Sequence, residues 1–308
     1  MDRPLVGDGD GANTRCRRCG TGSSRLDALE NGDAFAELRG WRVVAVRGSD
    51  AMTWLHDLVT TDVEGLSPGQ SRRSLLLTPT GRIRADLHVS RLEGSFLLLQ
   101  EGGQPEAVDS ILAPYVLSSD VDLEDRTERS VVVAVLGGAA AEDGDDVFVL
   151  APSVLGRGHD VVVPPGEPLH RLRERLRDRG VVEVTPQDLE TWRVRHGTVR
   201  MGSDFGPDSL PAEAGLEDTI DLTKGCFLGQ ESMAKVRNLG HPPWVLRLVH
   251  SDGPVLRGSP VLANGAEVGE VTSVAEGDGG TDAIVRVRWD AASGPLSTET
   301  GSLSLRHG

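Results

Sequence analysis

The sequence predicts an α+β region followed by a small C-terminal β-barrel. Up to residue 240, runs with strand-like alternation are interleaved with helix-like runs, whereas after it only strand-like runs and glycine-rich turns occur. Pro242 and Pro243 mark the change, because a residue that precedes proline is restricted to extended conformations. We therefore divide the chain into a disordered tail at 1–30, an α+β region at 31–240 and a β-barrel at 241–308.

Short runs rich in valine, leucine and isoleucine predict the strands of the α+β region. These runs are 41–46, 75–77, 82–92, 95–100, 130–136, 147–150 and 159–163. Helices are expected at 49–59, 105–116, 168–178 and 185–196. The last has a clear start, because Thr185 can cap it, Pro186 suits the first helical position and Asp188 lies at the positive end of the helix dipole.

The C-terminal part has three alternating runs, 244–249, 266–274 and 283–289, and no helix signal. Between the last helix and the linker, residues 198–223 contain few periodic apolar positions and several Gly, Pro and Asp residues. Long loops in compact domains are usually functional or disordered. We expect this segment to be an ordered loop that lies over a site.

The composition excludes several classes of protein. The 308 residues include 47 acidic and 32 basic ones, for a net charge of −15, which disfavours the broad basic surface that nucleic-acid binding needs. No run approaches the 18 apolar residues of a membrane span, and the amino terminus has no apolar core of the signal-peptide kind. We therefore expect a cytoplasmic protein.

The three cysteines do not form a disulfide framework in a chain of this length. Cys16 and Cys19 form a lone Cys-x-x-Cys in the polar tail, and no second pair supplies the four ligands that zinc usually needs. We interpret this pair as incidental and predict no metal site.

Residues 224–231, Lys-Gly-Cys-Phe-Leu-Gly-Gln-Glu, are the most informative stretch of the chain. Cys226 precedes a helix-compatible run at 230–237, and both the amino end of a helix and the nearby Lys224 favour the thiolate form of a cysteine. Gly225 and Gly229 allow tight turns on either side of the sulfur. The alternative is a buried structural cysteine in a strand-to-helix loop.

The motif Lys-Gly-Cys-Phe/Tyr-x-Gly-Gln-Glu resembles that of the YgfZ family, the folate-binding relatives of the glycine-cleavage T-protein. Three further segments resemble motifs of that family. They are 48–63, with Thr60-Thr61-Asp62-Val63 at its end, the hairpin segment 77–87, with Pro79-Thr80-Gly81-Arg82, and 211–216. The resemblance covers roughly residues 35–290 and implies T-protein-like mixed α/β domains around a central folate-binding channel, followed by the barrel.

The resemblance also implies a function. It implies a transferase-like accessory protein, without the T-protein reaction, that binds tetrahydrofolate or a derivative and supports the assembly or repair of iron–sulfur clusters. Cys226 carries that role, and Lys224 assists it. Iron–sulfur proteins or their assembly machinery are then the expected partners. Asp86, Arg195, Glu213, Gln230, Glu231 and Arg237 are the candidate cofactor-binding residues.

Two positions depart from the T-protein pattern. Ala85 stands where T-proteins have the first carboxylate of an Asp-Asp pair, and Asp86 retains the second. Arg195 stands where many relatives have a glutamate that meets the pterin ring, and arginine has no hydrogen-bond acceptor. Either another carboxylate, Glu190 or Glu213, takes over that contact, or the binding of folate is weak or altered.

Two alternative functions stay open at this point. One is a true folate-dependent aminomethyl or one-carbon transferase, which the resemblance in fold favours and which Ala85 and Arg195 disfavour. The other is a non-catalytic adaptor linked to tRNA modification, which the net charge of −15 disfavours.

Overall fold

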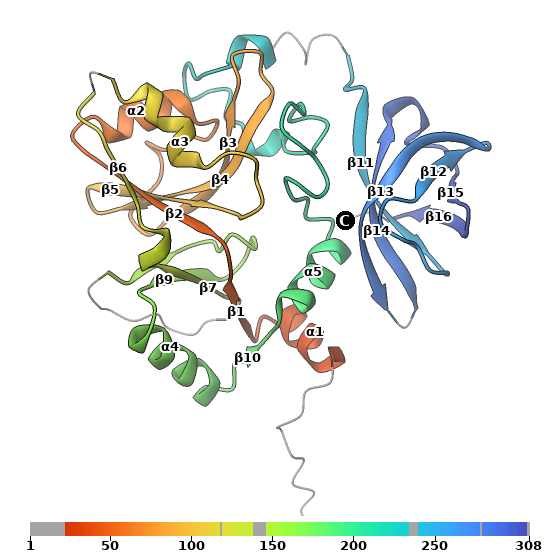
Figure 1. The fold of residues 1–308 in the computed structure, drawn as a ribbon, viewed down its shortest axis with the longest axis horizontal. Coiled ribbons are helices and arrows are strands. Elements are labelled where there is room, and N and C mark those ends of the chain that lie inside the picture. The colour runs from red at the N-terminus through yellow and green to blue at the C-terminus, as the bar shows by residue number, and fades with distance from the viewer. Residues whose placement is uncertain (1–21, 118, 138–145, 234–239, 278, 307–308) are drawn as a thin grey trace, which may run out of the picture.

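The computed structural model describes residues 22–117, 119–137, 146–233, 240–277 and 279–306 (Figure 1). Two packed sheets with their helices form one side of the molecule, and a closed barrel forms the other. Helix α5 (Pro186–Arg195) lies between the two sides. The predicted order, an α+β region followed by a β-barrel, is confirmed.

The first sheet is antiparallel throughout, and its strands follow the order β3-β4-β5-β2-β6. These strands are β2 (Arg42–Arg47), β3 (Ser71–Leu77), β4 (Ile83–Leu92), β5 (Ser95–Gln100) and β6 (Asp122–Asp125). Helices α2 (Ala51–Leu58) and α3 (Val108–Leu112) contribute Leu55 and Ile111 to the core on one face of this sheet. A short 3-10 helix, Thr127–Arg129, follows β6.

The second sheet has the order β10-β1-β7-β9-β8, in which only the β1–β10 pair is parallel. Its strands are β1 (Ala34–Leu38), β7 (Val131–Val135), β8 (Phe148–Leu150), β9 (His159–Val163) and β10 (Val182–Glu183). One face packs against the first sheet, where Leu97 and Leu99 meet Val132 and Val162. Helix α4 (Glu167–Asp178) covers the other face with Leu172 and Leu176.

The barrel closes in the order β11-β14-β13-β12-β15-β16 around a valine-rich core. Its strands are β11 (Trp244–Ser251), β12 (Pro260–Ala263), β13 (Ala266–Gly277), β14 (Gly280–Arg288), β15 (Leu296–Thr298) and β16 (Gly301–Leu305). The three long strands β11, β13 and β14 were predicted from their alternation. The 3-10 helix Trp289–Ala291 joins β14 to β15.

The structure corrects the boundary of the predicted tail. Residues 22–31 form helix α1 (Gly22–Asn31) rather than disordered chain, and Cys16 and Cys19 lie outside the described residues. Leu29 is fully buried, and the helix packs against Trp192 of α5. Apolar packing of Leu26 and Leu29 therefore orders a segment whose composition alone suggests disorder.

Two predicted helices also differ in detail. The helix expected at 105–116 is shorter, since α3 covers Val108–Leu112 and continues as the 3-10 turn Ala113–Tyr115. Pro114 explains the early end, because proline cannot donate the next helical hydrogen bond. Helix α2 begins after Asp50, whose carboxylate accepts a hydrogen bond from the Asp120 backbone instead of capping the helix.

A buried ionic network joins α5 to the barrel. The Arg193 guanidinium donates to Asp204 Oδ2 at 2.6 Å, to Glu190 Oε1 at 2.6 Å and to Ser273 Oγ of β13 at 2.8 Å. The Asp204 carboxylate is completely buried and also accepts from Thr272 Oγ1 at 2.8 Å. Threonine, serine and arginine donors thus satisfy a carboxylate that has no access to water.

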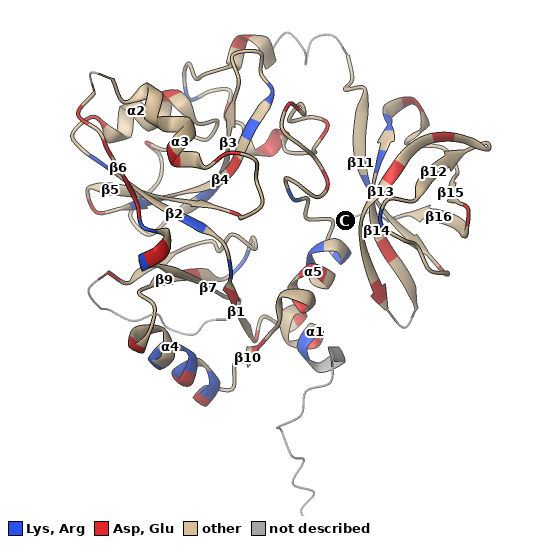
Figure 2. Cartoon of the chain, viewed as in Figure 1, with Lys and Arg blue, Asp and Glu red and all other residues tan. Residues whose placement is uncertain are grey.

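Charged residues of both signs are spread along the described elements. Figure 2 shows Lys and Arg interleaved with Asp and Glu, most clearly along α4. There Arg173 and Arg177 both pair with Glu183. Within the described ranges no helix is long and apolar enough to span a bilayer.

We predict that Arg193→Met strongly destabilises the fold, because it leaves the Asp204 carboxylate buried without its ionic partner. Breaking a buried pair from one side costs about 3–5 kcal/mol. Urea denaturation should show this loss. Arg288→Ala, which removes the exposed pair with Asp290, is the control and should leave the midpoint within error. A loss from Arg193→Met no larger than that of the control contradicts the assignment.

Candidate functional site

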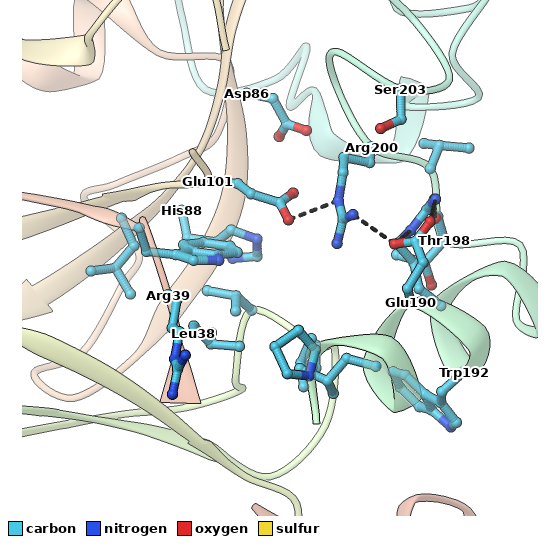
Figure 3. Close-up of a pocket in the computed structure, with 18 of the residues that line it drawn as sticks. Leu38, Arg39, Asp86, His88, Glu101, Glu190, Trp192, Thr198, Arg200 and Ser203 are labelled. Carbon is cyan, nitrogen blue, oxygen red and sulfur yellow. Dashed lines mark hydrogen bonds and ion pairs between the residues drawn. The ribbon is translucent and has the colours of Figure 1, made fainter. Parts of the chain in front are cut away.

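A cavity of about 510 Å³ lies where the two sheets meet α5 and the loop that follows it (Figure 3). Apolar side chains form much of its wall, among them Leu38, Trp41, Leu99, Leu155 and Leu189. Its charged lining residues are Glu37, Arg39, Arg73, Asp86, Glu101, Glu190, Arg193, Arg200 and Arg257. A cavity of this size and mixed lining is typical of a small-molecule site.

Paired charges cross the cavity. Arg73 holds both oxygens of Asp86, with Nε–Oδ1 at 3.0 Å and a second nitrogen at 2.6 Å from Oδ2. Arg200 reaches between Glu101 and Glu190, with its Nε 2.7 Å from Glu101 Oε1 and a terminal nitrogen 2.6 Å from Glu190 Oε2 (Figure 3). Internal arginines therefore neutralise most of the negative charge that faces a ligand.

His88 adds an uncharged side chain to the cavity wall. Burial, with a smaller contribution from the positive charge of Arg73, lowers the pKa of His88 to about 3. Its ring lies 6.3 Å from that of Trp41, measured between ring centroids. At physiological pH the imidazole is thus an uncharged partner beside the apolar wall.

Glu101 differs from its neighbours. Burial raises the pKa of Glu101, and only the charges of Arg200, Arg193 and Arg73 oppose that rise, while Asp86 adds to it. For Glu190 the balance is reversed: burial raises its pKa, but hydrogen bonds from Arg193 and the charges of Arg193 and Arg200 lower it overall. The neighbouring arginines therefore offset the cost of burial less well at Glu101 than at Glu190.

The alternation along β4 explains the departure at Ala85. Ala85 is fully buried in the hydrophobic core behind the sheet, beside Leu87 and Val89, whereas Asp86 faces the cavity. The absence of a carboxylate at position 85 therefore takes away no group that faces a ligand. It does not argue against a transferase. Asp86 itself is 8% exposed.

Arg195 does not line the cavity. Its guanidinium points to the barrel, where it contacts the Glu276 carbonyl at 3.3 Å and Asp282 at 3.9 Å. Of the two carboxylates that we considered as substitutes, Glu190 lines the cavity. Glu213 is buried elsewhere and accepts a hydrogen bond from the Leu210 backbone at 3.0 Å.

The structure places Cys226 on an exposed loop, which contradicts the alternative of a buried structural cysteine. Within the described part of the chain its thiol has no hydrogen-bonding partner. Gly225 and Gly229 have φ values of +112° and +86°, as the tight turns require. The helical residues begin at Gln230, four positions after the cysteine, and Arg237 lies outside the described residues.

Lys224 anchors the loop to α2. Its Nζ donates to the carbonyl of His56, and the His56 ring donates back from Nε2 to the Lys224 carbonyl at 2.9 Å. Burial lowers the pKa of Lys224 to about 8, although Asp57, Asp62, Asp221 and Glu64 act in the opposite direction. The side chain therefore braces the backbone beside Cys226. Within the described residues its ammonium contacts the His56 carbonyl and the Phe227 ring rather than the thiol.

Gln230 and Glu231 have different surroundings. Gln230 Oε1 accepts a hydrogen bond from the Phe227 backbone at 3.3 Å, as a loop brace should. Glu231 is exposed. Neither residue lines the cavity, so the structure does not bring the 224–231 segment and the cavity residues into one site.

Motifs that lie far apart in the sequence meet around Cys226. The turn of the β3–β4 hairpin touches the cysteine loop so closely that a Cβ on Gly229 would lie 2.5 Å from the Thr78 carbonyl oxygen. Ser232 Oγ donates to the Pro79 carbonyl at 2.8 Å, and the Leu228 backbone donates to Asp57 at 3.0 Å. The loop that carries the thiol is thus held by α2 and the hairpin together.

The cysteine loop and the cavity contact different parts of the β3–β4 hairpin. Gly81 touches the cysteine loop, and Asp86 faces the cavity five residues later. A fully extended chain rises about 3.3 Å per residue, so these two positions are at most roughly 16 Å apart. Among the described residues no group of three His, Cys, Asp or Glu side chains is placed to hold a metal ion.

Sequence reasoning missed four cavity residues: Arg73, His88, Glu101 and Arg200. They come from β3, β4, the end of β5 and the loop after α5, and no local spacing connects them. The alternation of β4 could have found His88, because it shares a strand face with Asp86. The other three become neighbours only through tertiary packing.

Comparisons with known proteins agree with this architecture. Residues 26–143 match the family model of the GCVT N-terminal domain. The chain is 24% identical over 281 residues to a chloroplastic protein of Arabidopsis thaliana named as a transferase, covering 83% of this chain and 65% of that protein. It is also 24% identical over 254 residues to an aminomethyltransferase of Alcanivorax borkumensis, covering 75% of this chain and 70% of that one.

A solved structure shows the same fold. The glycine cleavage system aminomethyltransferase T from Bartonella henselae aligns with a TM-score of 0.79 at 22% identity, over 92% of this chain and 88% of that chain. The protein therefore has the T-protein fold and aminomethyltransferase-like homologues, and residues 26–143 match the GCVT N-terminal domain family. The chain spans less than two thirds of the Arabidopsis relative.

We predict that Lys224 makes stability increase with pH between about 8 and its ordinary pKa of 10.5. In this window the folded protein has released the proton that the unfolded chain still binds, so the free energy of unfolding rises with pH. Urea denaturation at pH 7.5 and 10 should show a larger gain for the wild type than for Lys224→Met. Equal gains in the two proteins contradict the prediction.

Proposed function

We propose that this protein is a YgfZ-type accessory protein that binds a folate in the central cavity and supports iron–sulfur proteins through Cys226. The observation that carries the proposal is an exposed thiol on a loop that is tightly held on both sides. A cysteine needed only for packing has no reason to be exposed. Gly225 and Gly229 adopt the conformations that the turns require, and Lys224 braces the loop. Together they keep the thiol at the surface.

The cavity supports the folate part of the proposal. Its volume of about 510 Å³ suits a planar heterocycle with a short substituent. Leu38, Leu99 and Trp41 offer apolar contact to the faces of a ring, and Asp86 and Glu101 offer acceptors to its edge. Tetrahydrofolate or a derivative fits this combination of apolar walls and carboxylates.

The chemistry of a lone thiol limits what Cys226 does. A thiolate is both a nucleophile and a soft ligand for iron. A stable cluster normally takes four ligands, and one cysteine supplies one. We therefore propose transient contact with a client iron–sulfur protein or with its assembly machinery, in the cytoplasm, rather than a resident cluster.

We expect Cys226→Ala to fold normally and to fail in the cell. In a strain that lacks the protein, the wild type should restore the activity of iron–sulfur enzymes and Cys226→Ala should not. A Cys16→Ala, Cys19→Ala double variant is the matched control, because it removes the other two thiols, and it should rescue. Rescue by Cys226→Ala at equal protein level rejects the proposed role of the thiol.

A second candidate is a folate-dependent one-carbon transferase, and the position of Asp86 favours it. That carboxylate faces the cavity, where it can hold or polarise a nitrogen of the ligand. Both departures that argued against a transferase, Ala85 and Arg195, lie off the cavity. An adaptor for tRNA has less support, because the net charge of −15 disfavours a surface that binds nucleic acid.

An aminomethyl-transfer assay with tetrahydrofolate separates the two candidates. If the protein is a transferase, the wild type should be active, and Asp86→Asn should be slower by about 10²-fold or more, as for loss of a group that handles a proton. Cys226→Ala should then retain activity, because the thiol lies outside the cavity. An inactive wild type excludes this candidate and leaves the accessory role.

A further inference from the structure

The cavity contains an acceptor and a donor that the protein does not use. The oxygens of Asp86 accept hydrogen bonds from Arg73, and those of Glu190 accept from Arg193 and Arg200. Glu37 and Glu101, by contrast, accept no hydrogen bond from the described residues and make only charge contacts. These two carboxylates have spare acceptor capacity.

Glu37 and Glu101 occupy different positions. Glu37 lies between two arginines, at 3.5 Å from Arg39 and 3.6 Å from Arg173 of α4, the helix that covers the outer face of the second sheet. Glu101 has a single close contact, with Arg200, and Figure 3 shows it pointing into the cavity. Glu101 is therefore the carboxylate available to a ligand.

Arg200 completes the arrangement. Its Nε lies 2.7 Å from Glu101 Oε1, yet the N–H is not directed at that oxygen, and this buried nitrogen has no hydrogen-bond partner. A buried donor without a partner is costly, so a ligand acceptor at this position would be favourable. Glu101 and Arg200 thus form an adjacent acceptor and donor, held together by charge and unsatisfied by each other.

One kind of ligand edge satisfies both groups. A carboxylate accepts two parallel hydrogen bonds from neighbouring N–H groups, and a guanidinium N–H donates to a carbonyl oxygen. The 2-amino-4-oxopyrimidine ring presents these in a row: an amino group, a ring N–H and a carbonyl oxygen. Its faces would contact apolar wall residues such as Leu38 and Leu99.

We propose that Glu101 and Arg200 read the donor–donor–acceptor edge of a 2-amino-4-oxopyrimidine ring, such as the pterin of folate. This assignment rests on the proposed binding of folate in the cavity and names the residues that give it specificity. Glu101 would accept from the amino group and the ring N–H, and Arg200 would donate to the carbonyl. The edge is then recognised by β5 and the loop after α5, rather than by Arg195, which faces the barrel.

The test measures binding by titration calorimetry with three probes: folic acid, its 2-deamino analogue and its 4-amino analogue. The wild type should bind folic acid more tightly than either analogue. Glu101→Gln keeps the shape of the side chain but loses the charged acceptor, and it should weaken folic acid binding about 10- to 100-fold, the size of a charge-assisted hydrogen bond. It should also lose the preference over the 2-deamino analogue.

Two further variants sharpen the result. Arg200→Met should reduce, but not abolish, the preference for the 4-oxo over the 4-amino ring, because Glu101 still meets the ring N–H that the 4-amino ring lacks, and it should keep the preference for the 2-amino group. Glu37→Gln is the matched control, because it makes the same change at the other cavity carboxylate without a hydrogen bond, and it should bind as the wild type does. If Glu101→Gln does not fold, the preferences of the wild type among the three probes decide whether the assignment holds.

The outcomes separate this assignment from the proposed function. A wild type that binds folic acid but does not distinguish the analogues, or a Glu101→Gln variant with unchanged affinity and preference, overturns the assignment and leaves folate binding in place. A wild type that binds none of the reduced or oxidised folates overturns folate binding, and the assignment fails with it.

Discussion

The arrangement of this molecule depends on the buried ion pair between Arg193 and Asp204. A carboxylate with no solvent access has to be paired and hydrogen-bonded, and here the required donors come from α5 and from β13 of the barrel. The pair therefore fixes the barrel against the helix. Because the same guanidinium also holds Glu190, it sets one wall of the cavity as well. One arginine thus connects the architecture with the site.

The cavity shows how a strongly acidic chain can still present a balanced site. The net charge is −15, yet five arginines from separate parts of the chain face the ligand space. They donate hydrogen bonds to Asp86 and Glu190, and His88 stays neutral beside them. The electrostatic character of the cavity is therefore set locally, and the overall charge of the chain says little about the ligand.

Much of the fold could be predicted from the sequence, because long strands and capped helices carry their pattern locally. Helix α5 is one example: the predicted Thr185 cap forms a complete capping box with Asp188. The short strands β1, β6, β10, β12, β15 and β16 were missed, whereas the equally short β8 was found because it lies in a run rich in valine and leucine. Helix α1 was missed because its order comes from contacts with Trp192, far away in the sequence.

The candidate site likewise has one part that the sequence predicts and one part that it does not. The cysteine loop could be found, because its residues are contiguous and its glycines have a clear conformational purpose. The cavity could not, since Arg73, Glu101 and Arg200 meet only in the folded chain. Ala85 is instructive: an aligned position suggested a lost ligand contact, and the alternation of β4 shows that the position faces the core.

The close approach of Gly81 and Gly229 has a consequence for how such a protein can evolve. A side chain on Gly81 would come within 2.8 Å of the Met233 backbone nitrogen, and one on Gly229 within 2.5 Å of the Thr78 carbonyl oxygen. Neither glycine can change unless the facing backbone moves. The hairpin and the cysteine loop are therefore inherited as one unit: a related chain that keeps one of them without the other would have to rebuild the surface that presents the thiol.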